Sequence, residues 1–374
     1  MKLHDPTTEN WAEPKLSKAS GFLNPKREIS RTKQQKKMLL EEGRGKLLGW
    51  CDPEEHREWV RENKRREMVE KVTTLQEAVS RFVKNGCLLA LGGFGHVRVS
   101  MAFIYEIIRQ GKRGLKVAGK TAVHDLDCLI AAGCVEEVEV AYSFGHELRG
   151  LSPASRRAVE EGRVKVVAEL SNAAYQWRFK AAAAGLPFMP AYVMLGTDTF
   201  RRSSAKIIKD PFTNRPICLI PACFPDVVAI HVHEADVYGN CRIEGSLVED
   251  FELARAAKRL IITTERIIPT ERIRKEPWRT TIPYFYVDAV VKVPYGSHPC
   301  NMPGLYYFDE EHLAEYLSLT KTEEGTAKYF QEYVYGVEDF TQYLKKIGGR
   351  KKLKLLERLE RGRGTYTYPW RGKG

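Results

Sequence analysis

Long apolar runs are missing from this sequence. No stretch of about 18 apolar residues occurs, so no transmembrane helix is expected. The first residues, MKLHDPTTENWAEPK, have no apolar segment behind their charges, so no secretory signal is expected. These absences predict a cytoplasmic protein without a membrane partner.

Cysteine pairs with metal-binding or redox spacing are also missing. The eight cysteines are scattered, and none belongs to a C-x-x-C pair, so neither a zinc site nor thioredoxin-type chemistry is indicated. Most lie in apolar surroundings such as CLLAL and ICLIPACF, which favours small buried side chains.

Positive charge is present in excess but is concentrated at one end. The formal net charge is +12, and residues 345–374 hold eleven Lys and Arg against two Glu. An anionic partner fits this tail: nucleic acid, membrane headgroups, an acidic neighbouring protein or a phosphate-bearing cofactor. No nucleic-acid motif accompanies the charge, so nucleic acid is not the expected partner.

Three regions differ in composition. Residues 1–70 form a charged extension with an expected helix that Asp52 caps and Pro53 begins. Residues 71–349 alternate short apolar runs, including CLLAL and YVMLG, with helices of about three turns, closing with helices near 309–319 and 322–346. Residues 350–374 form a basic tail. The alternation predicts an α/β fold, a three-layer α/β/α arrangement around a mainly parallel sheet.

A glycine-rich loop follows the first expected strand, in CLLALGGFGHVR at residues 87–98. Ligands of such sheets sit beyond the carboxyl ends of the strands, where bare backbone N–H groups can approach an anion or an oxyanion. Gly93-Phe94-Gly95-His96-Val97-Arg98 lacks the third glycine of a dinucleotide fingerprint, and no acid ends the next strand. No Gly-Lys-Ser/Thr follows either. Nicotinamide and Walker-type nucleotide sites are therefore not expected.

NGCLLALGGFGHVR resembles the glycine signature of class I CoA-transferase alpha subunits, and Arg98 matches their glutaconate CoA-transferase branch. Ser100 replaces the proline that is usual there. The segments AAAAGLPFMP, VVAIHVHEADVYGN, AAKRLIITTERII and VEDFTQYLKKIGG are similar to the alpha subunit of glutaconate CoA-transferase in the same order. The resemblance covers roughly residues 72 to 349 and implies the CoA-transferase fold.

The resemblance implies covalent catalysis by a glutamate that takes CoA from an acyl-CoA and passes it to an organic acid. In two-subunit members this glutamate lies on a beta chain, in a Ser-Glu-Asn-Gly-like stretch that this sequence lacks. We therefore expect no catalytic nucleophile here, a partner that is a separate beta subunit, coenzyme A as cosubstrate, and no permanently bound cofactor. Glu147, in SFGHELRGLSP, is the weak catalytic candidate; its alternative is a surface charge.

The implied substrate and CoA wall consists of Gly92, Gly93, Phe94 and Gly95, with Arg98 holding a substrate carboxylate. The alternative for Arg98 is a structural ion pair with a loop acid. A further binding candidate is Asn172, which matches the position of a glutamate in ring-cleaving CoA-dependent hydrolases of the same fold. An amide cannot act as a general base, and Asn172 alternatively caps a helix beside Ser171.

The histidines indicate no metal. His231 and His233 alternate on an expected strand and share a face, but the similar family has a histidine in this stretch without a metal. His96 and His146 are expected to be solvent-exposed loop residues rather than acid–base groups. Two alternatives to the transferase remain open: a hydrolase cleaving carbon–carbon bonds in rings, and a non-catalytic assembly or RNA-associated protein that uses the basic tail.

Overall fold

The computed structural model describes residues 38–363, and residues 39–363 belong to one compact unit. Among these residues, no helix is both long enough and apolar enough to cross a membrane. The strands are β1 (Leu39–Glu42), β2 (Leu88–Leu91), β3 (Leu115–Lys120), β4 (Val135–Ala141), β5 (Lys165–Glu169), β6 (Phe188–Ala191), β7 (Lys206–Lys209), β8 (Pro216–Pro221), β9 (Val227–Ala235), β10 (Cys241–Arg242), β11 (Arg259–Ile267) and β12 (Ala289–Lys292). The α-helices are α2 (Pro53–Asn63), α3 (Leu75–Phe82), α4 (Met101–Arg109), α5 (His124–Ala131), α6 (Pro153–Glu160), α7 (Asn172–Ala183), α8 (Asp198–Arg202), α9 (Asp250–Ala256), α10 (Thr270–Lys275), α11 (Glu310–Leu319), α12 (Glu323–Phe330), α13 (Phe340–Lys346) and α14 (Gly349–Glu360).

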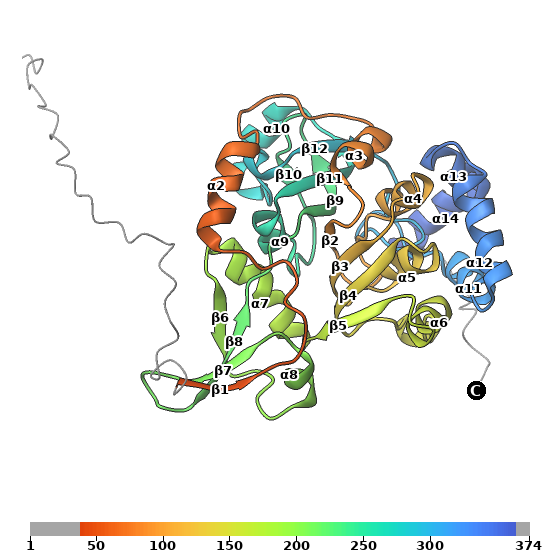
Figure 1. The fold of residues 1–374 in the computed structure, drawn as a ribbon. Coiled ribbons are helices and arrows are strands. Elements are labelled where there is room, and N and C mark those ends of the chain that lie inside the picture. Colours follow the sequence, from red (N-terminus) through yellow and green to blue (C-terminus); the bar gives the residue numbers. More distant parts are fainter. Residues whose placement is uncertain (1–37, 364–374) are drawn as a thin grey trace, which may run out of the picture. The chain divides into compact units, whose positions relative to one another are not determined.

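The main sheet has eight strands and is parallel along the path β12-β11-β9-β2-β3-β4-β5 (Figure 1). Among the strands of residues 38–363, only β10 pairs antiparallel within this sheet, at the end of β9. The chain runs outward from β2 through β3 to β5, and later outward from β9 through β11 to β12. The order of strands therefore reverses between β2 and β9, which is where sheets of this kind bind ligands.

Helices cover both faces of this sheet and produce two apolar cores. One core joins the sheet to α3–α6 and α11–α13, and the other joins it to α7 and α9. Strand β2 shows the reason: Leu89 points into the first core, whereas Leu88 and Ala90 point into the second. The predicted α/β/α arrangement around a mainly parallel sheet is thereby confirmed.

Capping residues fix several of the predicted helix starts. The Asp52 side chain accepts a hydrogen bond from the N–H of Glu54, and Pro53 occupies the first helical position of α2. The Thr74 hydroxyl accepts from Glu77 N at the start of α3, and the Ser171 hydroxyl accepts from Ala174 N at the start of α7. Ser171, not Asn172, therefore caps α7.

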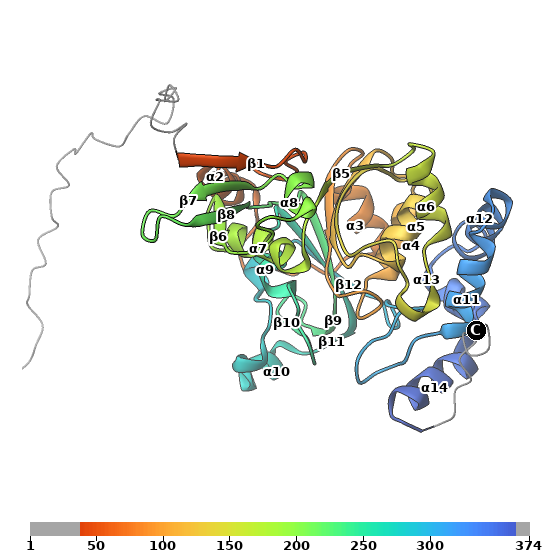
Figure 2. The same ribbon diagram turned by 90° about the horizontal axis from the view of Figure 1, so that it is seen from below.

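A second, four-stranded antiparallel sheet of order β1-β7-β8-β6 lies beside the main one (Figure 2). The sequence did not indicate this sheet. The predicted strand at YVMLG is wrong, because the strand lies just before it, at Phe188–Ala191, and pairs with β8. Residues 192–196 turn instead towards α8.

The first boundary expected from composition, at residue 71, divides segments that pack together. Strand β1 pairs with β7, and the Lys64 ammonium lies 3.0 Å from Asp288, with both side chains almost fully buried. Val72 also bridges Val290 of β12. Residues 39–70 are therefore part of the folded unit, and the rest of the expected extension, residues 1–37, lies outside the described residues.

The second boundary, at residue 350, cuts into α14. Leu356 is fully buried, Leu353 nearly so, and the Leu356 carbonyl accepts a hydrogen bond from Tyr307 N. The basic segment 349–360 is thus an amphipathic helix with an anchored apolar side, and residues 364–374 lie outside the described residues. The single helix expected over 322–346 is divided into α12, a π-helical turn at Gln331–Tyr335, and α13.

Candidate active site

The glycine loop lies at the reversal point of the sheet, between β2 and α4. Gly93 has φ +88°, and a Cβ there would lie 2.5 Å from the Val97 carbonyl oxygen and 2.7 Å from that of Arg98. Gly95 also has a positive φ, and its Cβ would meet a carboxylate oxygen of Glu147 at 2.9 Å. Glycine is required at Gly93 because the chain folds back on itself there, and at Gly95 the positive φ favours glycine.

The amides of this loop are already hydrogen-bonded. Gly92 N donates to Ala229 O, Phe94 N to Val97 O, Gly95 N to Thr121 O, and Gly93 N to the Asp250 carboxylate. The expectation that these amides face a ligand as free donors is wrong, because the strand neighbours and the loop itself use them. The loop instead presents bare backbone and the half-exposed Phe94 ring.

Arg98 is held inside the chain by a carboxylate that the sequence did not reveal. Its side chain is 1% exposed, and its two terminal nitrogens lie 3.1 and 2.5 Å from the oxygens of Asp250. The same guanidinium donates to the Ser246 carbonyl at 3.0 Å. The structure therefore shows the alternative expected for Arg98, a structural ion pair, and its two terminal nitrogens are not free to hold a substrate carboxylate.

Unusual backbone conformations collect at the carboxyl edge of the sheet. Gly93 follows β2, Thr121 follows β3 with φ 47°, and Tyr142 follows β4 with φ 52°; Glu147, farther along the connection after β4, has φ 54°. Left-handed conformations of non-glycine residues cost free energy and cluster at functional sites. Together with the reversal of strand order, they mark this edge as the candidate active site.

Asn172 and Glu147 both lie at this edge. The Thr121 hydroxyl donates to the Asn172 side-chain oxygen at 3.5 Å, and the Thr121 carbonyl is the acceptor for Gly95. The Glu147 carboxylate lies 3.3 Å from His96 Nδ1 and 3.1 Å from Arg149, and its side chain is 40% exposed. The hydrogen bond with His96 lowers the pKa of Glu147, which keeps it ionised near neutral pH.

The loop histidines are buried, contrary to the sequence-based expectation. His96 is 2% exposed and His146 is fully buried, and their ring nitrogens lie 3.0 Å apart. His146 in turn lies 3.5 Å from the buried Asp127. Burial lowers the pKa of His96 to about 4, so its ring is neutral near pH 7. The side chains of Glu147, His96, His146 and Asp127 thus form a continuous row that leads from the exposed carboxylate into the interior.

The two strand histidines serve structural hydrogen bonds. His231 lies 2.8 Å from the Glu265 carboxylate and 2.9 Å from the Thr263 hydroxyl, and His233 lies 2.9 Å from the Pro303 carbonyl. Within residues 38–363, no group of three or more His, Cys, Asp or Glu side chains is arranged to hold a metal ion.

Large apolar side chains are exposed around the same edge. Tyr142, Leu148 and Leu151, in the connection that follows β4, are 74%, 69% and 66% exposed, and Phe94 of the glycine loop is 37% exposed. We call these four side chains the edge patch. An apolar group of this kind beside a strained loop is typical of a protein–protein or ligand contact.

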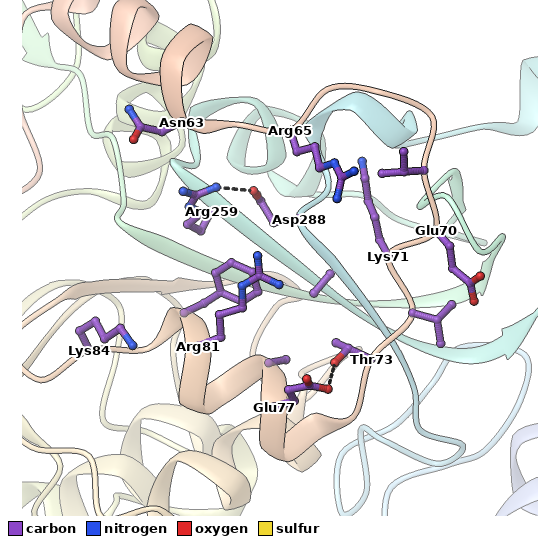
Figure 3. A pocket seen from close by; sticks show the side chains of 15 residues that line it. Asn63, Arg65, Glu70, Lys71, Thr73, Glu77, Arg81, Lys84, Arg259 and Asp288 are labelled. Atoms are coloured by element: carbon purple, nitrogen blue, oxygen red, sulfur yellow. Dashed lines mark hydrogen bonds and ion pairs between the residues drawn. The ribbon is translucent and has the colours of Figure 1, made fainter.

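A large cavity of about 590 Å³ lies elsewhere, at the amino ends of β11 and β12 (Figure 3). It is lined by Arg259, the first residue of β11, and by Ala289, the first residue of β12. Because all strands on this path are parallel, this edge is opposite the glycine loop. The cavity is therefore separate from the candidate active site.

Comparison with known proteins places the chain in one family. The family of coenzyme A transferases matches residues 72–293. The A subunit of glutaconate CoA-transferase from Acidaminococcus fermentans is 34% identical over 302 residues, which is 76% of this chain and 94% of that protein. The A subunit of 3-oxoadipate CoA-transferase from Pseudomonas knackmussii is 34% identical over 73% of this chain and 97% of its own length.

The structural comparison agrees. The crystal structure of glutaconate CoA-transferase from A. fermentans superimposes with a TM-score of 0.74 at 33% identity, covering 77% of this chain and 95% of that one. The cholesterol ring-cleaving hydrolase IpdA subunit of Mycobacterium tuberculosis is more distant, 27% identical over 72% of this chain and 95% of its own length. The transferase interpretation is confirmed, and the hydrolase alternative is not better supported. The chain belongs to the coenzyme A transferase family, as a member of its alpha-subunit type.

Proposed function

We propose that this chain is the alpha subunit of a two-subunit CoA-transferase and forms one wall of an active site completed by a beta subunit. The observation that carries the proposal is the edge patch, because exposed apolar side chains beside a strained, glycine-rich edge are expected where another chain closes the site. The relatives that support it are themselves A subunits of CoA-transferases.

In this proposal the partner supplies the glutamate. Its carboxylate attacks the thioester carbonyl and releases the CoA thiolate, which then attacks the resulting anhydride at the glutamyl carbonyl. The first acid leaves as a carboxylate, and the glutamyl thioester passes CoA to the second acid by the reverse steps. Each step conserves charge without a proton transfer, so the chain needs no acid–base group of its own.

This chain would shape the cavity in which these steps occur. The Arg98–Asp250 pair holds the glycine loop, whose lack of side chains at Gly92, Gly93 and Gly95 allows a thioester to approach the backbone closely. Phe94 would supply an apolar wall for the acyl group.

Asn172 would supply a polar contact to the substrate. It is exposed at the first position of α7, and its oxygen accepts from Thr121, which leaves its amide N–H groups pointing elsewhere. Those donors would hold a substrate carboxylate or the thioester carbonyl. Glu147, ionised and beside Gly95, would repel a second carboxylate and so limit where the acid binds.

The test is co-expression with a candidate beta chain, followed by assay of CoA exchange between two acids. The isolated chain should be inert, and the complex should show ping-pong kinetics and a glutamyl thioester that borohydride traps. Turnover by the isolated chain would contradict the proposal. Thioester consumption without an acceptor acid would favour a hydrolase instead.

A matched pair of variants tests the proposed contact surface. Leu148→Asp together with Leu151→Asp should abolish co-purification with the beta chain, because two charges would be buried without partners. Phe212→Asp should leave the complex intact, since Phe212 is 96% exposed in the turn between β7 and β8, away from the edge patch. If the double variant and Phe212→Asp co-purify with the beta chain to the same extent, the assignment of this surface is refuted.

A further inference from the structure

The cavity at the amino ends of β11 and β12 has more cations than acids in its wall. It lies beneath the connection between α2 and α3 and has a volume of about 590 Å³. Figure 3 shows its charged side chains reaching in from this connection, from α3 and from β11, while Glu70 lies off to one side. The cationic lining residues are Arg65, Lys71, Arg81, Lys84 and Arg259, and the acidic ones are Glu70, Glu77 and Asp288.

Two of the acids are already neutralised or hydrogen-bonded. Asp288 lies 3.0 Å from the Lys64 ammonium and 2.9 Å from the Arg259 guanidinium, and it also accepts from the Leu260 amide at 2.8 Å. Glu77 accepts a hydrogen bond from the Thr73 hydroxyl at 2.5 Å, at the margin of the cavity. Asp288 is therefore shared between two cations, and the lining as a whole holds two more cations than acids, five against three.

Several cations lack such compensation. Lys71 is 8% exposed, and its ammonium donates to the Tyr284 carbonyl at 2.6 Å. Within residues 38–363, no carboxylate lies within ion-pair distance of Lys71, Arg81 or Lys84. Burial lowers the pKa of Lys71, which reflects the cost of keeping this charge away from water. An anion in the cavity would offset that cost.

One guanidinium is held rigidly at the cavity wall. Arg259 stacks on the Trp59 ring, with its central carbon 4.9 Å from the ring centroid, and lies 5.9 Å from the centroid of Phe82. Its pairing with Asp288 fixes it further. A pre-positioned, planar guanidinium binds phosphate or carboxylate oxygens with little loss of side-chain entropy.

We propose that this cavity binds a small polyanion that carries phosphate or carboxylate groups. Its volume is in the range that holds a small-molecule ligand rather than a single ion. Most of the residues between Asn63 and Thr73 that line it precede the family-matched segment, which begins at residue 72. The site therefore depends on this chain's extension, and its occupant would not compete with a substrate at the glycine loop on the opposite edge.

Calorimetric titration of the full chain tests the proposal, with pyrophosphate as the phosphate probe and citrate as the polycarboxylate probe. At least one should bind, and raising the salt concentration should weaken it. Binding of pyrophosphate alone identifies a phosphate ligand, and binding of citrate alone a polycarboxylate. If neither binds at about 1 mM, the proposal is overturned.

Matched variants separate the cavity from general positive charge. Arg81→Gln and Lys84→Gln replace exposed side chains of the cavity and should each weaken binding about tenfold, the loss expected for one charge-assisted hydrogen bond. Arg61→Gln removes an exposed cation from α2 outside the lining and should change affinity less than about twofold. Equal losses in all three variants would overturn the proposal. Unchanged melting temperatures would show that the variants remain folded.

Discussion

Replacing Asp250 by Asn should loosen the glycine loop and destabilise the whole domain. Asp250 is fully buried and accepts hydrogen bonds from Gly93 N and from both terminal nitrogens of Arg98. Asparagine keeps the shape and one acceptor oxygen but places an NH₂ group against the guanidinium. The Arg98 charge, 1% exposed, is then left without a counter-charge.

The magnitude follows from burial. Removing one partner of a buried ion pair costs roughly 3–5 kcal/mol, and the retained oxygen places Asp250→Asn at about 3 kcal/mol. Arg98 also has φ 59°, a conformation that costs roughly 1–2 kcal/mol in an L-residue and that the pair helps to maintain. Domains are stabilised by about 5–15 kcal/mol in total, so the loss is readily measurable.

Calorimetry of the wild type, Asp250→Asn, Arg98→Met and the double variant completes a double-mutant cycle. The midpoint of Asp250→Asn should fall by about 2 °C for each kcal/mol lost. The free energy of unfolding lost in the double variant should be smaller than the sum of the two single losses by at least about 1 kcal/mol, because the double variant removes both buried charges. Additive losses, or a loss below about 1 kcal/mol for Asp250→Asn, would refute the view that this pair holds the loop.

Three further predictions concern the loop, the buried histidines and the last helix. Gly93→Ala should cost at least about 2 kcal/mol and exceed Gly133→Ala, because both have positive φ but only Gly93 would press a Cβ on neighbouring backbone; equal losses would contradict this. Burial lowers the pKa of His96 from 6.5 to about 4. Between these two pH values the unfolded chain binds a proton on His96 and the folded chain does not. Stability present above pH 6.5 should therefore fall as the pH drops towards 4, by up to about 1.4 kcal/mol per pH unit, and His96→Gln should flatten that dependence in denaturation midpoints. Leu356→Ala should cost about 2–5 kcal/mol, because its side chain is fully buried in a small apolar cluster with Met302 and Tyr306, whereas Lys351→Ala on the exposed side of α14 should cost less than about 0.5 kcal/mol; similar midpoints for both would show that α14 contributes little.

The sequence was sufficient for features that depend on neighbouring residues. The cap at Asp52, the apolar run of β2 and the glycines after it are local signals, and each element formed where the pattern predicted it. The position of the loop at the carboxyl edge follows from parallel strands alone.

Features that depend on distant residues could not be predicted. Asp250, the partner of Arg98, lies far along the chain, and no spacing rule connects the two. The burial of His96 and His146 results from α5 and α11 packing over their loops, which polarity alone does not reveal. The antiparallel sheet joins the distant β1 to three strands of four to six residues within 188–221, and strands this short carry little periodicity.

The neighbours of β2 have a consequence for how the protein is made. β2 pairs on one side with β3, which follows it closely, and on the other with β9, which is synthesised only after every strand from β3 to β8. Contacts of such long sequence separation form slowly. A nascent chain still lacking β9 therefore leaves one edge of β2 with unpaired backbone groups and cannot fix the Gly93 loop, so a translation pause before residue 227 should leave a species that needs chaperone protection.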